Sequence, residues 1–116
     1  MNKFPKWIIS VSTRDRYAIN YDLFEVIPQV SLYSSIMPFY VHQLYNVMIK
    51  HVGKTVNSFI DGTAHIGTDT LHLAKLYSKS SVTAVEVDRT VCDVLERNVY
   101  RIGGVLRLNN KFTILN

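Results

Sequence analysis

Between residues 56 and 115, short runs of apolar and β-branched residues alternate with longer stretches that carry apolar residues at helical spacing. Short apolar runs bounded by turn residues predict buried strands, and apolar residues at i, i+3, i+4 and i+7 predict amphipathic helices. The resulting order of strand, helix, strand, helix and strand is typical of a parallel α/β sheet. The predicted strands are 56–60, 82–85 and 111–115, and the predicted helices are 68–77 and 88–102, the second ended by Gly103-Gly104.

The chain before this unit contains one further predicted helix, from Pro38 to Val52. Pro38 suits the first helical position, Gly53 suits a helix stop, and the apolar residues between them repeat at helical spacing. Residues 1–35 show no clear helical or strand period, so we expect loops with short pieces of structure there. The sequence therefore divides into a loop-rich N-terminal segment, 1–35, and an α/β unit, 36–116.

The first two predicted strands each end at a carboxylate, Asp61 and Glu86. Parallel strands bring their carboxyl ends to one edge of the sheet, which is where doubly wound folds bind nucleotides. An acid after the second strand is a typical acceptor for ribose hydroxyls, and Glu86 follows Gly67 by 19 residues, near the spacing of dinucleotide folds. These two acids therefore indicate a nucleotide or nucleoside site.

The turn between the first strand and its helix, residues 62–67, lacks the usual phosphate-binding sequences. It contains neither GxGxxG nor GxxxxGK[ST], whose glycines let the backbone approach phosphates. Acids on both sides of the turn would repel a pyrophosphate and attract a cationic ligand. S-adenosyl-L-methionine, which carries an ammonium, a sulfonium and an adenosine, has these properties.

The run DGTAHIGTDTLHLAK followed by VTAVEVD resembles the cofactor-binding core of class I S-adenosylmethionine-dependent methyltransferases. Within that superfamily it is most similar to the trimethylguanosine synthase group, which methylates the guanine N2 of RNA caps. The resemblance covers residues from about 36 to 116, and its specific part is about 30 residues long. It implies a Rossmann-like three-layer α/β/α sandwich with a parallel sheet, of which about three strands are present, and a capped RNA as substrate.

The resemblance implies cofactor contacts for eight residues. Asp61 would lie near the amino group of S-adenosyl-L-methionine, and Glu86 would accept hydrogen bonds from the ribose hydroxyls. The residues placed against the methionine portion are Thr63, Ala64, His65 and Gly67, and those that cap the following helix and face the cofactor carboxylate are Asp69 and Thr70. Asp88 is expected to cap the next helix.

Two positions depart from the pattern of the family. His65 stands where the common GxG pattern has its first glycine, so it needs a backbone angle that tolerates a side chain or more room beside the ligand. Thr68 likewise replaces a residue that is often a small glycine. His65 lies in the turn that is predicted to contact the cofactor and Thr68 directly follows it, so both substitutions are expected to affect the affinity for the cofactor.

The catalytic residues of the family follow a fourth strand, in an Asn-Pro-Pro-Trp type sequence that this chain does not contain. The catalytic residues are therefore unknown from this sequence, and we expect the front half of an enzyme, a truncated form or a degenerate relative. Two alternatives stay open. One is a noncatalytic methyltransferase-like binding or regulatory module, and the other is a methyltransferase of the same fold that acts on tRNA, rRNA or a small molecule.

The charge of the chain favours nucleic acid over acidic partners. Thirteen lysines and arginines against nine acids give a net charge of +4, although scattered basic residues are also typical of an ordinary solvated surface. In the N-terminal segment, aromatic residues interleave with Arg14 and Arg16, a pattern that either stacks bases and holds phosphates or builds a core. Those aromatic residues are Tyr17, Tyr21, Phe24 and Tyr33.

Metal and disulfide chemistry find little support in the sequence. The one cysteine, Cys92, excludes a disulfide within the chain and a cysteine-based zinc cluster, and we expect it to be buried. The four histidines lack the spacing of a helical zinc site. Asp61 with Asp69 could bind magnesium through waters, but the phosphate-binding loop that usually accompanies such a site is missing, so no metal site is predicted.

The sequence contains no apolar run of about 20 residues and no signal-like N-terminus, so we expect a soluble intracellular protein, cytoplasmic or nuclear. A parallel sheet of three strands leaves an edge without a hydrogen-bonding partner. We therefore expect self-association, or a partner that covers the exposed sheet edge.

Overall fold

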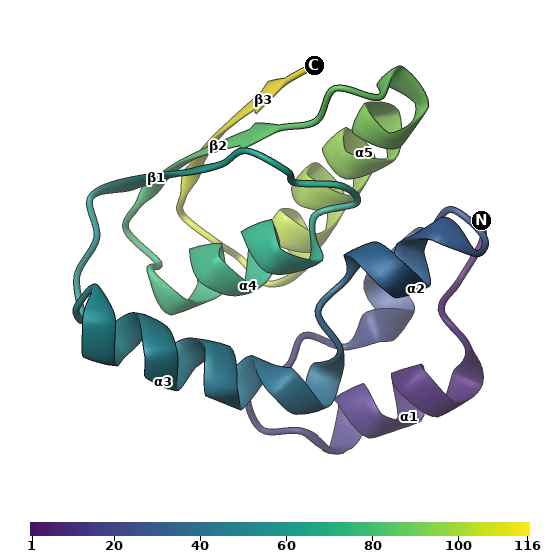
Figure 1. The fold of residues 1–116 in the computed structure, drawn as a ribbon, viewed down its shortest axis with the longest axis horizontal. Coiled ribbons are helices and arrows are strands. Elements are labelled where there is room, and N and C mark those ends of the chain that lie inside the picture. The colour runs from purple at the N-terminus through teal and green to yellow at the C-terminus, as the bar shows by residue number, and fades with distance from the viewer.

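The computed structural model describes residues 1–116, except for the side chain of Tyr33. A three-stranded sheet lies on one side of the molecule and the helices lie on the other (Figure 1). The elements are α1 (Lys6–Arg14), η1 (Tyr21–Leu23), α2 (Val30–Ser34), η2 (Pro38–Tyr40), α3 (Val41–His51), β1 (Ser58–Asp61), α4 (Thr68–Leu76), β2 (Ser81–Val85), α5 (Arg89–Val105) and β3 (Lys111–Leu115). The predicted α/β class and the predicted alternation of strands and helices are confirmed.

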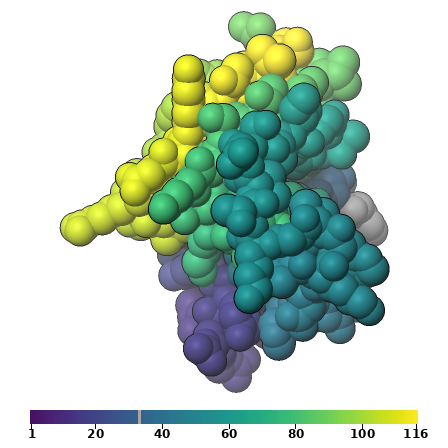
Figure 2. Space-filling model, turned by 90° about the vertical axis from the view of Figure 1, so that its left-hand side faces the viewer, coloured from purple at the N-terminus to yellow at the C-terminus, as the bar shows by residue number. Residues whose placement is uncertain are grey.

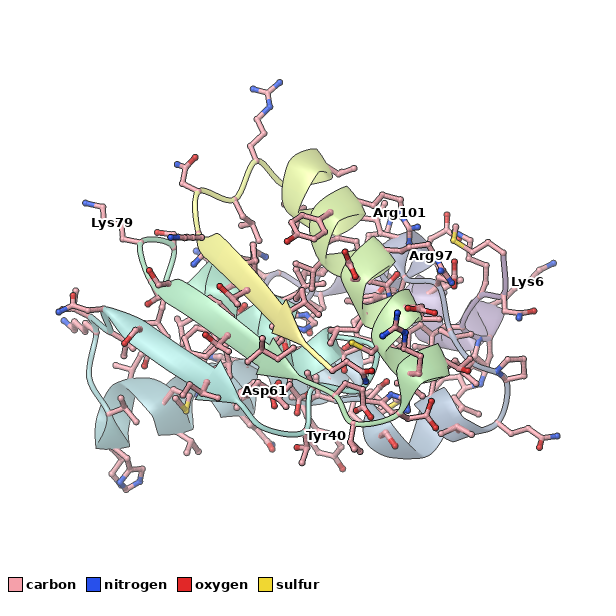
Figure 3. The ribbon with its side chains drawn as sticks, turned by 90° about the horizontal axis from the view of Figure 1, so that it is seen from above. Lys6, Tyr40, Asp61, Lys79, Arg97 and Arg101 are labelled. Atoms are coloured by element: carbon pink, nitrogen blue, oxygen red, sulfur yellow. The ribbon has the colours of Figure 1, made fainter. Side chains whose placement is uncertain are left out.

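The three strands are parallel and lie in the order β1-β2-β3. Ser58 aligns with Ser81, which aligns with Lys111, so all three strands begin at the same edge of the sheet. The segments that lead into the strands lie side by side on the surface seen in Figure 2. The carboxyl ends of the strands share the opposite edge, where Figure 3 shows Asp61.

Helices α4 and α5 connect the strands and lie on one face of the sheet (Figure 1). Val82 and Ala84 of the central strand point toward this face and are buried. The described residues place no helix on the other face, where Ile60 is 73% exposed. Helices of the N-terminal half, α1, α2 and α3, instead lie beyond α4 and α5, on the side away from the sheet (Figure 1).

Residues 1–35 are more helical than their sequence pattern predicted. Helix α1 has nine residues where loops with short pieces of structure were expected. Its buried positions are Ile8 and Ser12, and the Ser12 hydroxyl donates to the carbonyl of Ile9 and accepts the backbone N–H of Tyr21. A buried serine therefore stands where an amphipathic pattern would show an apolar residue, which hides the helical period.

The predicted helix at 38–52 is confirmed as η2 followed by α3. Pro38 opens η2, and Gly53, with a φ of 122°, follows the last turn of α3. The backbone N–H of Gly53 donates to the carbonyl of Met48. Val41 and Tyr45 of the apolar stripe are buried, so the helix is anchored mainly by its first half.

The prediction that Gly103-Gly104 ends α5 was wrong. The helix continues to Val105, and the chain turns at Arg107, which adopts a left-handed φ of 55°. A Cβ on Gly103 would lie 3.6 Å from the Phe112 ring, an ordinary van der Waals distance, so the packing of β3 does not require glycine here. Both glycines lie inside the helix, and the left-handed turn position that glycine usually occupies carries an arginine.

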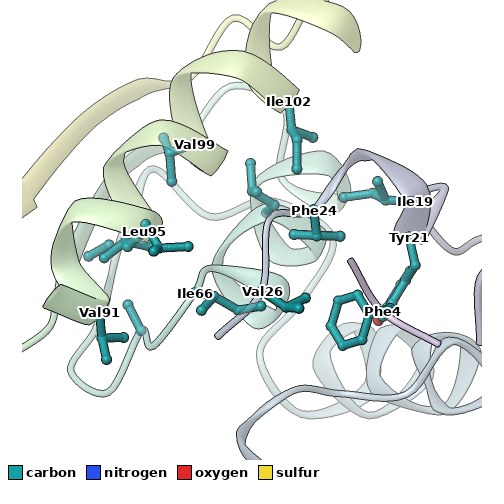
Figure 4. Packing of buried hydrophobic residues seen from close by; sticks show 14 of the residues in the cluster. Phe4, Ile19, Tyr21, Phe24, Val26, Ile66, Val91, Leu95, Val99 and Ile102 are labelled. Carbon is teal, nitrogen blue, oxygen red and sulfur yellow. The ribbon is translucent and has the colours of Figure 1, made fainter. Parts of the chain in front are cut away.

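One apolar core joins the N-terminal segment to α4 and α5 (Figure 4). From the N-terminal segment it contains Phe4, Ile8, Ile19, Tyr21, Phe24 and Val26, and from the α/β unit it contains Ile66, Leu71, Leu95, Val99 and Ile102 among others. Burial of apolar surface is the main stabilising contribution to a fold. Because the cluster is shared, residues 1–35 stabilise the α/β unit directly.

A buried histidine adds a polar link between the same two parts. His72 on α4 is fully buried; its Nε2 accepts the backbone N–H of Ile19 at 3.0 Å, and its Nδ1 lies 2.7 Å from the carbonyl oxygen of Thr68. This arrangement requires a neutral ring with the proton on Nδ1.

No helix of the described residues is both long enough and apolar enough to cross a membrane.

Candidate functional site

The eight residues predicted to contact a cofactor lie around the carboxyl ends of β1 and β2. Asp61 is the last residue of β1, and Glu86 directly follows β2. The other six lie in the turn after β1 or in the first turn of α4, namely Thr63, Ala64, His65, Gly67, Asp69 and Thr70. The parallel register therefore places both carboxylates at the same end of the sheet.

Asp61 links the end of β1 to α4. Its Oδ1 accepts the backbone N–H of Thr63 at 3.2 Å, and its Oδ2 accepts the hydroxyl of Thr70 at 2.7 Å. The carboxylate is only partly buried. Each carboxylate oxygen has two acceptor positions, so Asp61 can still bind a cation or a further donor.

Glu86 is oriented by two backbone groups. Its Oε1 accepts the N–H of His65 at 2.9 Å, and its Oε2 accepts the N–H of Asp88 at 3.0 Å. One oxygen thus contacts the turn after β1, and the other contacts the segment that opens α5. The position of the carboxylate is fixed by the protein itself, and both oxygens keep one acceptor position for a ligand.

The backbone of the turn is held against β2. The N–H of Ala64 donates to the carbonyl of Val85 at 3.0 Å, and the N–H of Gly67 donates to the carbonyl of Ala64 at 2.9 Å. Gly67 has a φ of 97°, and a Cβ there would lie 3.0 Å from the Leu95 side chain. Glycine is needed at position 67 both for its conformation and for its close approach to α5.

His65 adopts a left-handed backbone conformation, with a φ of 50°. Two ways to accommodate a side chain in this turn were expected, a tolerant backbone angle or more room beside the ligand. The backbone angle corresponds to the first. Both ring nitrogens are buried and have no hydrogen-bond partner among the described residues. Partial burial lowers the pKa of His65, although the Glu86 and Asp88 carboxylates act in the opposite direction. The ring is therefore neutral near pH 7.

The prediction that Asp69 and Thr70 cap α4 was wrong. The cap position is Gly67, which has no side chain to offer, and both residues lie inside the first helical turn. Asp69 is still placed favourably for the helix dipole. Partial burial, followed by repulsion from the Asp61 carboxylate, raises the pKa of Asp69. The expected cap of α5 is confirmed, because Asp88 accepts the N–H of Val91 at 3.0 Å.

Asn98 positions the turn and was not identified from the sequence. This side chain of α5 is fully buried. Its Nδ2 donates to the carbonyls of Ile66 and Glu25, both at 2.9 Å, and its Oδ1 accepts the N–H of Glu25 at 2.9 Å. The only signal in the sequence is a polar residue on the apolar stripe that contains Leu95 and Val99.

The aromatic residues of the N-terminal segment serve mainly as core. Tyr21 and Phe24 are fully buried, so neither can stack a base. Tyr17 reaches the surface, where its ring stacks on His42 with the centroids 4.5 Å apart and the Arg16 guanidinium lies 5.6 Å from the ring centre. The fourth residue, Tyr33, has a side chain outside the described part of the structure.

Metal-binding groups do not gather anywhere in the described part of the chain. No set of three histidine, cysteine, aspartate or glutamate side chains described by the structure is placed to hold a metal ion. Cys92 is buried as expected. Burial, with smaller contributions from nearby acids, raises the pKa of this thiol and makes it less reactive.

No protein-family model and no curated protein sequence matches the chain. Among solved structures, it is similar to a protein from Clostridium thermocellum assigned as an rRNA methylase, with a TM-score of 0.48 and 20% identity over 64% of this chain. It is also similar to a protein described for the conversion of a disulfide bond into a thioacetal group during echinomycin biosynthesis, with a TM-score of 0.42 and 23% identity over 63% of this chain. The chain spans 39% and 28% of the lengths of these two proteins. At such identities the likeness concerns the fold alone.

Proposed function

We propose that this chain binds S-adenosyl-L-methionine at the carboxyl ends of β1 and β2 and forms the cofactor-binding part of a methyltransferase. One observation carries the proposal. Two oriented carboxylates, Asp61 and Glu86, end adjacent parallel strands on either side of a turn that leads into α4. Ligands of open α/β sheets bind at this edge, and the acids favour a cationic nucleoside over a phosphate-bearing one.

The residues at this edge fit the three polar parts of the cofactor. Glu86 keeps one acceptor position on each oxygen, which suits the two neighbouring hydroxyls of a ribose. Helix α4 begins at Thr68, and its cap residue Gly67 has no side chain, so the first backbone N–H groups of the helix can meet a carboxylate. Asp61 supplies the negative charge for an ammonium group.

When bound, the cofactor supplies a methyl group activated by its sulfonium. The contribution of this chain is to hold the cofactor in a fixed position. Backbone hydrogen bonds of the turn and the Asn98 side chain order the site in advance, which reduces the entropy lost on binding. No residue of this chain is assigned to the acceptor side.

We propose RNA as the methyl acceptor, with the guanine N2 of a cap as the preferred position. The support is the sequence resemblance to the trimethylguanosine synthase group together with the net charge of +4, which favours a polyanion.

A second candidate is a noncatalytic binding or regulatory module of the same fold. The observation that favours it is His65, whose side chain occupies a left-handed position of the turn next to Glu86. If the ring hinders the cofactor, the variant His65→Gly will bind it more tightly than the natural chain does.

Calorimetric titration with S-adenosyl-L-methionine and S-adenosylhomocysteine tests the proposal. We expect dissociation constants on the order of micromolar, and at least a tenfold loss, about 1.4 kcal/mol, in Glu86→Ala. The matched control is Glu96→Ala, which removes an exposed acid of α5 outside the predicted site and should leave binding unchanged. Absence of binding by a chain whose circular dichroism shows it to be folded, for both the natural sequence and His65→Gly, would refute the cofactor assignment.

A further inference from the structure

The charged residues divide between the two edges of the sheet. The segments that lead into the strands, 50–57, 75–80 and 106–111, contain six lysines and arginines and no acid. The segments at the carboxyl ends, 61–70 and 86–93, contain five acids and one arginine. In Figure 3, Lys79 and Asp61 mark the two opposite ends of the sheet. We call the first group the basic edge; it consists of Lys50, Lys54, Lys75, Lys79, Arg107 and Lys111.

Helix dipoles account for only half of the basic edge. Cations near the carboxyl ends of α3, α4 and α5 are favourable for the helices, which explains Lys50, Lys75 and Arg107. The remaining three lysines lie beyond the helices, with one before or at the start of each strand. They are Lys54, Lys79 and Lys111, and all three are exposed.

The outer lysines of the basic edge have no acidic partner within the described part of the structure. The ion pairs that it shows join Lys3, Arg89 and Arg97 to acids elsewhere on the molecule. None of Lys54, Lys79 and Lys111 makes an ion pair or a side-chain hydrogen bond to a described residue. The positive potential of this edge is therefore available to an anionic partner.

Two hollows flank the basic edge, and each combines aromatic rings with a cation. The larger, of about 410 Å³, is lined by the stacked rings of Tyr17 and His42, by Tyr45, and by the cations Arg16 and Lys75. The smaller, of about 290 Å³, is lined by Tyr100, Arg107, Asn109 and Asn110 among others. Aromatic rings beside cations suit bases that alternate with phosphates, whereas a lipid surface or an acidic peptide has no need of them.

We propose that the basic edge and its two hollows bind single-stranded RNA, at the end of the sheet opposite to Asp61 and Glu86. The outer lysines contact phosphates, and the surface rings Tyr17 and His42 accept a base. The acids at the other edge repel phosphates, so the backbone of the RNA is held away from them. The choice of RNA over DNA rests on the proposed function, but the surface is separate from the carboxylate site, so the two proposals can fail independently.

Fluorescence anisotropy with a labelled single-stranded RNA of about 12 nucleotides tests the inference without any cofactor. The variant Lys54→Gln/Lys79→Gln/Lys111→Gln should lower the affinity at least tenfold. It should also reduce the slope of log affinity against log salt by about 2, since each phosphate contact on a single strand contributes about 0.7. The matched control Lys3→Gln/Lys6→Gln/Arg89→Gln removes the same charge elsewhere and should leave the slope unchanged.

A second variant distinguishes binding of RNA from binding of any polyanion. His42→Ala removes an exposed ring from the larger hollow and should weaken RNA binding about fivefold or more. It should leave the binding of inorganic polyphosphate unaltered. The inference is overturned by equal losses in the two triple variants, by no RNA binding of the folded chain at about 50 mM salt, or by tighter binding to phosphatidylserine vesicles than to RNA.

Discussion

His72 is the residue whose ionisation matters most for the fold. It must be neutral to accept the N–H of Ile19, and burial lowers its pKa from the usual 6.5 to about 4. The unfolded chain takes up this proton near pH 6.5, so the stabilisation is complete above that pH and is lost as the pH falls toward 4. We predict a loss on the order of 2 kcal/mol between about pH 7 and pH 5, measured by urea unfolding.

Substitution controls can assign this pH dependence. In His72→Gln the protein should be less stable at pH 7, and its stability should change less between the two pH values. His51→Gln replaces an exposed histidine and should keep the full dependence. A pH profile that is unaltered in His72→Gln would contradict the assignment, and the partly buried His65, whose pKa is also lowered, would then be the next residue to test.

At the scale of single residues, the sequence predicts what depends on local order and misses what depends on distant partners. Asp61 and Glu86 could be placed at one edge because each directly follows a β-prone run. Asn98 could not be assigned, because its partners Glu25 and Ile66 lie 73 and 32 residues away along the chain. A polar residue on an apolar stripe indicates a buried hydrogen bond, but it does not name the partner.

At the scale of elements, the end of α5 carries a measurable strain. Arg107 occupies the left-handed position of a Schellman turn, in which its N–H donates to the carbonyl of Gly104 and the N–H of Leu108 donates to the carbonyl of Gly103. A side chain costs about 1 kcal/mol in this conformation relative to glycine. We predict that Arg107→Gly raises the free energy of unfolding by about 1 kcal/mol in urea titrations.

The control for this prediction is Arg107→Ala, which removes the same charge but keeps a Cβ. It should give no comparable stabilisation. Equal stabilisation by both variants would point to relief of charge repulsion within the basic edge as the cause. A decrease in stability in the glycine variant would show that the stem of the arginine packs usefully against its surroundings.

Helices and strands could be predicted wherever the sequence shows either a short apolar run or apolar residues at helical spacing. The three strands and the helices α3, α4 and α5 follow from apolar runs and helical spacing. Helix α1 was missed because a serine occupies one of its two buried positions, and hydrogen bonds rather than apolar contacts hold it there. The extension of α5 through two glycines was missed because glycine usually marks the end of a helix, and the local pattern gives no other signal there.

For the whole molecule, the uncovered face of the sheet is the surface that most favours self-association. Ile60 is 73% exposed and Leu115 is 49% exposed on this face, and the described residues add no strand beyond β1 or β3. Exposed apolar surface and open strand edges promote association. We predict self-association that increases with concentration, measured by sedimentation velocity and reduced in Ile60→Lys.

The matched control replaces Val47, which is 54% exposed on α3, by lysine. This change adds the same charge away from the sheet and should leave association unaltered. A natural chain that stays monomeric at high concentration would exclude the sheet face as a contact surface.

The hydrogen bonds of Asn98 have a consequence for local opening. One side chain holds the backbone of Glu25 in the N-terminal segment and the carbonyl of Ile66 in the turn after β1. Detachment of the segment therefore removes a support of the turn, and loosening of the turn weakens the attachment of the segment. The two regions should open to solvent as one cooperative unit, so that amide protons 40 residues apart in the sequence, those of Glu25 and His65, exchange at related rates.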